Sequence, residues 1–251
     1  MATPSLRPLT VGEVLDVSFG LYRLLFAPLV VIAAVTQLIP VLLSVYMAAA
    51  GGAEEHVPLA LATYCLAIFL SAFGVAASTF VVSDTYLGRE TSASDALSRA
   101  GALIGRLVAI SILAWLLVMV GMILLIIPGI ILAAGLALSA VVAVVEGPPS
   151  ATAAMGRSWQ LTKSYRGKVL LTVIVSILLL MVPGIAVGVA TALFTMLVGG
   201  AGRLIAVILQ SGLQVCVYPF VYVVLTVLYY DIRVRKEGFD LELLASALPA
   251  T

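Results

Sequence analysis

The stretch LVAISILAWLLVMVGMILLIIPGIILAAGLALSAVVAVV runs from Leu107 to Val145 and contains no Asp, Glu, Lys or Arg. A bilayer core about 30 Å thick needs roughly 20 helical residues to cross it, so this stretch is nearly long enough to cross twice. The chain is 63% hydrophobic and only 10% charged, which is far from the composition of soluble domains. The sequence therefore predicts an all-α integral membrane protein. Four further windows without these charged residues cover residues 24–53, 57–83, 169–202 and 204–230.

Two proline–glycine pairs bear on the number of spans. Pro128 and Gly129 lie near the middle of the opening stretch, and they predict a hairpin tip because Pro lacks a backbone donor and Gly permits tight turns. A tip at Pro183 and Gly184 would leave too few residues upstream, so we expect a kinked or tilted single helix there, with a re-entrant turn as the alternative. The six expected spans cover residues 24–48, 58–83, 107–127, 129–146, 168–197 and 204–230.

The positions of the basic residues favour six spans over seven. With six spans, one side of the membrane receives every Lys and Arg residue of the chain except Arg203. This asymmetry follows the positive-inside rule, and a seventh span beginning at Pro183 would spoil it. We therefore expect both termini in the cytoplasm, with a cytoplasmic tail over residues 231–251.

Three segments share a degenerate pattern, in which a hydroxyl residue is followed by small or aliphatic residues at helical spacing. They begin at Thr10, Ser92 and Ser150, and each of these hydroxyl groups can cap a helix N-terminus. The pattern predicts amphipathic helices at the cytoplasmic interface, each turning into the membrane at a basic residue. One interpretation is a threefold repeat of interfacial helix plus helical hairpin, and the other is a chance alignment of short Ala/Leu/Ser helices. The expected interfacial helices cover residues 10–22, 92–104 and 150–163.

A few polar side chains lie inside the expected spans. Gln210 and Gln214 are one helical turn apart with Tyr218 on the same face, and Gln37 lies one turn before Pro40. These four polar residues are a candidate intramembrane polar face that lines a polar path or a lipid-headgroup cleft. The alternative is that they hold helices together by hydrogen bonds, each worth about 1 kcal/mol.

Charged residues at the cytoplasmic side form a second candidate site. They come from the first and third interfacial helices and from the segment that leaves the last span. Opposite charges would pair readily there because the dielectric constant of the interface is reduced. The interpretations are a structural lock between the interfacial helices and the sixth span, an anchor, or a surface for a headgroup or partner. The candidate charge lock consists of Glu13, Asp16, Arg157, Asp231, Arg233, Arg235 and Glu237.

The C-terminal segment carries signals for where helices end and begin. The last helix is expected to continue into water past Arg235 and to stop at Gly238, a common residue after a helix C-terminus. Asp240 can then cap a short final helix bearing Leu241, Leu244 and Leu248.

Four parts of the chain carry distinctive strings: Arg7-Pro-Leu-Thr-Val-Gly-Glu-Val-Leu-Asp16 with Leu21-Tyr-Arg23, Ile127-Pro-Gly-Ile130, Glu146-Gly147 followed by Arg157-Ser-Trp-Gln-Leu161, and Tyr230-Asp-Ile-Arg-Val-Arg-Lys-Glu-Gly238. Together these strings resemble one protein family, the membrane domain of bacterial glycerophosphoryl diester phosphodiesterases in its stand-alone actinobacterial form. The resemblance covers nearly the whole chain, and it implies a helical domain in the bacterial cytoplasmic membrane. It does not imply phosphodiesterase activity, since that chemistry belongs to a separate soluble barrel, which we expect to be absent.

The remaining polar residues suggest no chemistry. With His56 as the single histidine and no metal-ligand spacing, we assign no catalytic residue, cofactor or metal. Cys65 and Cys216 lie in apolar windows and are expected to be packing residues rather than a disulfide. Gly184 and Gly188 form a pair that is expected to let helices approach closely.

The leading functional hypothesis is a non-enzymatic membrane module that scaffolds or anchors a partner, or acts as an accessory in membrane or lipid-related processes. The alternative is a transporter or channel-like protein for a lipid or a small neutral solute, and a membrane-embedded hydrolase is third. Expected partners are membrane lipids and another membrane or cytoplasmic protein. The sequence does not decide whether the protein is a homo-oligomer. The net charge of +1 argues against nucleic acid as a partner.

Overall fold

The structure is a computed structural model that describes residues 7–89 and 91–239. Within those residues the chain is all-helical and contains no strand, and six segments are long and apolar enough to cross a membrane. The predicted all-helical architecture, with six segments able to span a membrane, is therefore confirmed. The spans are α2, α3, α5, α6 with α7, α9, and α10 with α11. The helices are α1 (Val11–Leu24), α2 (Phe26–Ala49), α3 (Val57–Tyr86), α4 (Ala93–Gly101), α5 (Ile104–Leu124), α6 (Ile126–Leu136), α7 (Ser139–Val145), α8 (Ala151–Thr162), α9 (Arg166–Val198), α10 (Gly200–Val217) and α11 (Pro219–Glu237), with a short 3-10 helix η1 (Ala53–Glu55).

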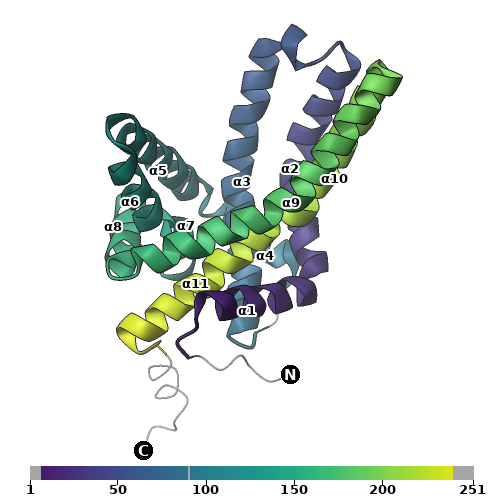
Figure 1. The fold of residues 1–251 in the computed structure, drawn as a ribbon. Helices are drawn as coiled ribbons and strands as arrows, with labels where there is room; N and C mark the ends of the chain where they lie inside the picture. The colour runs from purple at the N-terminus through teal and green to yellow at the C-terminus, as the bar shows by residue number, and fades with distance from the viewer. Residues whose placement is uncertain (1–6, 90, 240–251) are drawn as a thin grey trace, which may run out of the picture.

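The long helices form hairpins whose turns lie at one end of the molecule. Figure 1 shows the α2–α3, α5–α6 and α9–α10 turns toward the top, and α1, α4 and the end of α11 toward the bottom. Arg203 at the start of α10 donates to the carbonyl of Gly51, so the α9–α10 turn contacts the α2–α3 connection. The α5–α6 hairpin diverges from α2, α3 and α10 toward the same end (Figure 1). We call the end with these turns the turn end and the opposite end the base.

The tightly packed core lies at the base. There α1 packs on α11, α4 on α3, and α8 on α7. Tyr229 and Tyr230 of α11 are fully buried, and the ring of Tyr230 stacks on that of Tyr86 from α3 at a centroid distance of 5.1 Å. Nearer the turn end, large apolar side chains such as Leu124 and Leu197 are exposed. An exposed apolar surface of this extent is expected where helices face lipid.

Short helices begin where the sequence predicts. The side chain of Thr10 accepts a hydrogen bond from the Glu13 amide, and the Glu13 carboxylate accepts one from the Thr10 amide, which completes a capping box. Ser92 and Ser150 accept hydrogen bonds from backbone amides three residues later. Because each cap satisfies a donor that would otherwise lack a partner, α1, α4 and α8 start directly after their caps.

The prediction of a hairpin tip at Pro128 and Gly129 is wrong. The chain turns at Leu125, which is extended with φ −159° and ψ 137°, and α6 has already begun at Ile126. Pro128 fits the first turn of α6, where backbone donors have no helical acceptor in any case. Gly129 instead lets α6 approach α5 closely, since a Cβ atom there would lie 2.7 Å from the backbone nitrogen of Met122.

The window around Pro183 forms one helix, as expected, and the alternative of a re-entrant turn is wrong. Helix α9 runs without a break for 33 residues with Pro183 inside it. At 1.5 Å per residue its length is about 50 Å, which exceeds the thickness of the hydrocarbon core. A helix of this length fits the bilayer by tilting, and Figure 1 shows α9 strongly inclined to α3.

The last span is divided between α10 and α11 at Tyr218. Pro219 has no N–H group to donate back along the helix, and the hydroxyl of Tyr22 in α1 donates to the nearby carbonyl of Cys216. Helix α11 ends at Glu237, and Gly238 adopts a left-handed conformation (φ 63°, ψ 38°), which confirms the predicted stop. The short helix expected after Asp240 lies outside the described residues.

Candidate functional site

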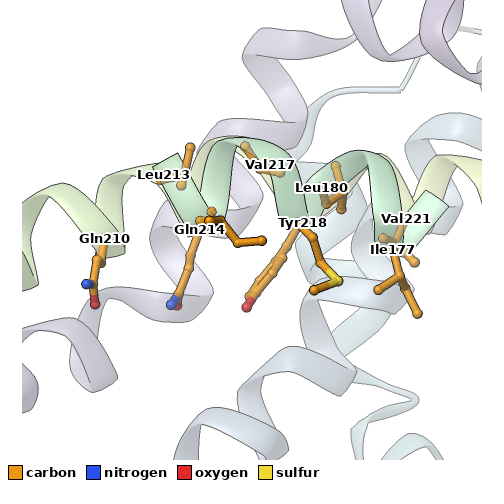
Figure 2. A pocket seen from close by; sticks show the side chains of 11 residues that line it. Ile177, Leu180, Gln210, Leu213, Gln214, Val217, Tyr218 and Val221 are labelled. Atoms are coloured by element: carbon orange, nitrogen blue, oxygen red, sulfur yellow. The ribbon is translucent and has the colours of Figure 1, made fainter. Parts of the chain in front are cut away.

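A groove of about 510 Å³ lies between α9 and α10, and we call it the α9–α10 groove. Its walls are mostly apolar, and three polar residues interrupt them: Gln210, Gln214 and Tyr218. Figure 2 shows these three side chains projecting from the same side of the helix, one after another along its axis. We call this row the polar ladder. The apolar and small residues of the lining are Ile177, Leu180, Met181, Gly184, Ile185, Leu213, Val217 and Val221.

Hydrogen bonding between helices accounts for one member of the polar ladder. The side-chain amide of Gln210 donates to Oγ1 of Thr191 in α9 at 3.2 Å. The side chains of Gln214 and Tyr218 are exposed, and neither forms a hydrogen bond within the described part of the chain. The interpretation that these residues hold helices together by hydrogen bonds therefore fits Gln210 but not Gln214 and Tyr218.

Gln37 belongs to α2 and lies against another side of α10. It lines a hollow between α2 and α10 together with Ser211, and a smaller one together with Gln214 and Tyr218. Its side chain also has no hydrogen-bond partner among residues 7–89 and 91–239. The four polar residues predicted from the sequence thus gather around α10, with Gln37 beside the α9–α10 groove rather than in it.

The polar ladder lies in a segment that is long and apolar enough to cross a membrane. Counted along α10 at 1.5 Å per residue, Gln210 and Gln214 lie about 16 Å and 22 Å from the turn at Gly199. These distances run along a helix that packs against the inclined α9, so the depth of the two residues is smaller, and both fit within a hydrocarbon core about 30 Å thick. A polar group there costs free energy unless a partner bonds to it, because lipid chains offer no hydrogen bonds.

The charged residues at the base form two separate clusters. In the first, which we call the Asp231 cluster, the buried carboxylate of Asp231 accepts hydrogen bonds from the Leu9 amide (2.7 Å), from Arg235 (3.1 Å) and from Lys168. The carbonyl of Leu9 accepts from Lys168 at 2.6 Å and from Arg235 at 2.5 Å. This cluster ties the segment before α1 to α9 and α11.

The second cluster, the Arg157 cluster, joins α8, the end of α7 and α11. Arg157 pairs with Glu146 at 2.8 Å and with Glu237 at 2.6 Å, and Glu237 also pairs with Arg233 at 3.0 Å. Tyr229 donates to Glu146 at 2.9 Å. Hydrogen bonds to Glu237 and Glu146 raise the pKa of the Arg157 guanidinium, so both carboxylates face a permanently charged group.

The expected single charge lock is therefore corrected to two clusters, and two of its members belong to neither. Glu13 is held by its own helix cap and by Arg7, and the backbone hydrogen bond from Thr10 is the largest cause that lowers the pKa of Glu13 to about 2. Asp16 is exposed and forms no ion pair with the described residues. A capping carboxylate bonds to its own helix N-terminus, which leaves it unavailable to a distant cation.

Sequence reasoning missed several members of the clusters. In the sequence Lys168 is only one of the many basic residues predicted on the same side of the membrane, and the Leu9 backbone gives no signal at all. Glu146 belongs to one of the strings quoted above, but those strings assign it no partner. A further missed pair is Arg99 with the buried Asp84, at 2.6 Å, which holds α4 to α3. Its signal was an acid directly after the apolar window 57–83.

No family model matches the chain, and neither a curated protein nor a solved structure matches it.

Proposed function

We propose that this chain is a non-catalytic integral membrane module that binds an amphipathic molecule from the bilayer in the α9–α10 groove. The observation that carries the proposal is the pair Gln214 and Tyr218, whose hydrogen-bonding groups have no partner within the described residues and line an otherwise apolar groove. Such groups are unfavourable against hydrocarbon, and a bound molecule with polar atoms would satisfy them. The apolar walls would hold its chains.

This proposal favours a role in handling a lipid or neutral solute over a purely passive scaffold. Carrying the molecule across the membrane and presenting it to a partner protein both fit such a groove. A scaffold or anchor is the second candidate function, and the two clusters at the base support it. They tie the segment before α1, α8, α9 and α11 into one frame, which would offer a stable surface to a cytoplasmic partner.

We propose the cytoplasmic membrane of a bacterium as the location, with both termini inside. In this orientation the base faces the cytoplasm, and α1, α4 and α8 are interfacial amphipathic helices. Each of the three precedes a pair of spans in the element order, which supports the threefold repeat as part of the same proposal. Membership of the family of phosphodiesterase membrane domains also stays a proposal, and it rests on the quoted strings.

A matched pair of glycine variants tests the proposed function. Gly184 lines the groove and Gly188 does not. A Cβ atom at either position would meet nothing within 4 Å, so the expectation that this pair serves close helix approach is wrong. Gly184→Leu is expected to lower photo-crosslinking of a membrane-soluble lipid probe to α9 and α10 peptides about tenfold by filling the groove. Gly188→Leu is expected to leave it unchanged. Equal crosslinking of both variants and the wild-type protein would contradict binding in this groove.

A further inference from the structure

We propose that the ligand of the α9–α10 groove is an uncharged lipid with a hydroxyl or ester group beside its acyl chains, the class that includes the diacylglycerols. This inference rests on the proposed function, because it names the chemistry of the molecule that the same groove binds. Three properties of the groove lead to it: its charge, its hydrogen-bonding groups and its depth.

The charge of the groove argues against an ionic headgroup. None of its eleven lining residues is Asp, Glu, Lys, Arg or His. An anionic phosphate or a cationic amine placed there would lose water without gaining a counter-charge, which is costly at low dielectric constant. Lys168 of α9 and Arg235 of α11 are both engaged by Asp231 at the base. A neutral ligand avoids the cost of burying an unpaired charge.

The hydrogen-bonding groups fit a hydroxyl or an ester. Gln214 offers two amide donors and a carbonyl acceptor, and Tyr218 offers a hydroxyl that both donates and accepts. The two residues lie one helical turn apart on the polar ladder (Figure 2). A ligand hydroxyl would donate to one and accept from the other, and an ester carbonyl would accept from either. A plain hydrocarbon would leave both residues unsatisfied.

The shape and depth of the groove fit an elongated molecule that lies along α10. The apolar residues Ile177, Leu180 and Ile185 provide a wall for acyl chains on the α9 side. The polar ladder extends from Tyr218 near the base toward the middle of the membrane at Gln210. A lipid without a charged headgroup can bring its ester or hydroxyl below the interface to this depth, whereas a charged headgroup is held at the surface. The volume of about 510 Å³ is within the range of ligand sites, roughly 300–1,000 Å³, so the chain ends would extend into the bilayer.

The test is a competition experiment on the full chain in nanodiscs with a photoreactive diacylglycerol probe. Unlabelled dioleoylglycerol is expected to compete at least about tenfold more strongly than dioleoyl phosphatidic acid or dioleoyl phosphatidylglycerol, which carry the same chains. Gln214→Leu is expected to weaken probe binding about tenfold and Tyr218→Phe several-fold, as for the loss of one hydrogen bond away from water. Gly188→Leu is the control and is expected to bind like the wild-type protein.

Three results would overturn the inference, and they separate it from the proposed function. If the anionic lipids compete as well as dioleoylglycerol, the lipid class is wrong, while binding in the groove stands. If the probe does not label α9 or α10 and Gly184→Leu changes nothing, binding in the groove fails as well. If crosslinking instead joins two copies of the chain through α9 and α10, and Gly184→Leu separates them, the groove is an interface between copies and holds no lipid.

Discussion

Among single residues, Asp231 is the one on which the base depends most. Its carboxylate is buried in α11 and is reached by two cations and by the Leu9 amide, so three segments of the chain meet at one charge. A buried ion pair is only a weak source of stability by comparison with apolar packing. Removing one partner is a different matter, because the remaining charge stays buried without compensation.

Asp231→Asn is accordingly expected to destabilise the protein by about 3–5 kcal/mol, since Lys168 then keeps its charge in a site that no longer neutralises it. Denaturation of the detergent-solubilised protein, followed by circular dichroism, measures the loss. The exposed Asp16→Asn variant is the control, with an expected change below about 0.5 kcal/mol. Equal stability of the two variants would show that the Asp231 cluster contributes nothing.

Glu13 makes the stability of the folded protein depend on pH in the acid range. Its pKa is lowered from 4.5 to about 2 in the folded state, mainly by the Thr10 amide. A carboxyl group with a depressed pKa contributes stability that is fully present above its unfolded pKa and is lost as the pH falls through its folded pKa. The melting temperature of the wild-type protein is therefore expected to exceed that of Glu13→Gln above about pH 5, with the difference disappearing toward pH 2. A constant difference over this range would contradict the role of the capping box.

At the scale of single elements, the boundary between α10 and α11 shows how a helix break is tolerated in a membrane. Pro219 interrupts the helical hydrogen bonds, and the Tyr22 hydroxyl donates to the Cys216 carbonyl at the same place. The Tyr22 ring also packs edge-on against Phe220, with centroids 5.8 Å apart. Helix α1 thus holds the position at which the last span bends, directly beside the base end of the α9–α10 groove.

Tyr22→Phe keeps this ring and removes only the hydroxyl. It is expected to destabilise the protein by about 1–3 kcal/mol, the cost of a backbone carbonyl left without a partner. Hydrogen exchange of the amides between 216 and 221 is expected to become faster. The amide of residue 219 in a regular helix would bond to the carbonyl of Val215 and not to that of Cys216. Tyr22→Phe is therefore expected to cost about as much in a Pro219→Ala background, and a double-mutant cycle measures the coupling. A loss below about 0.5 kcal/mol for Tyr22→Phe would show that the Cys216 carbonyl does not depend on this hydroxyl.

Elements were predictable from the sequence where a local signal fixes them. The hydroxyl caps at Thr10, Ser92 and Ser150 place the starts of three helices, because capping depends on residues only a few positions away. The turn at Leu125 was not predictable from Pro128, since its position depends on how closely α5 and α6 approach at Gly121 and Gly129.

The residues of the candidate sites were likewise predictable only where a local pattern in the sequence brings them together. The polar ladder follows from a helical period within one segment, so Gln210, Gln214 and Tyr218 were found together. The two clusters at the base were found only in part, because their pairs join residues far apart in the chain. Lys168 and Asp231 are 63 positions apart, and the third participant in that cluster is the backbone of Leu9. A single sequence carries no signal for such pairing.

At the scale of the whole molecule, the base and the turn end differ in charge. Nearly all basic residues lie toward the base, and Arg203 lies at the turn end against Gly51. In the proposed orientation the base faces the cytoplasm. Ala53 in η1 and Lys163 directly after α8 are both exposed and lie at the two ends, so they make a matched pair of probes.

With Cys65 and Cys216 replaced by Ala, Ala53→Cys is expected to react with a membrane-impermeant maleimide added outside right-side-out vesicles. Lys163→Cys is expected to react only after the vesicles are inverted or permeabilised, because it lies on the cytoplasmic side. The reverse pattern would place the base outside and overturn the proposed orientation.

The turn at Leu125 affects the number of spans that a labelling experiment with membrane-impermeant reagents would detect. Residues 123–127 are five consecutive exposed apolar side chains, and the bonds from the Leu125 amide to Gly121 and from the Gly129 amide to Leu125 close the turn. The side chains of such a tip favour the edge of the hydrocarbon, whereas the free backbone groups of the turn need polar partners in the headgroup region. A cysteine at position 125 is therefore expected to escape the impermeant maleimide from both sides, whereas Ala53→Cys reacts. Surface mapping of the intact protein would then report a four-span protein, although the described residues contain six segments long and apolar enough to cross a membrane.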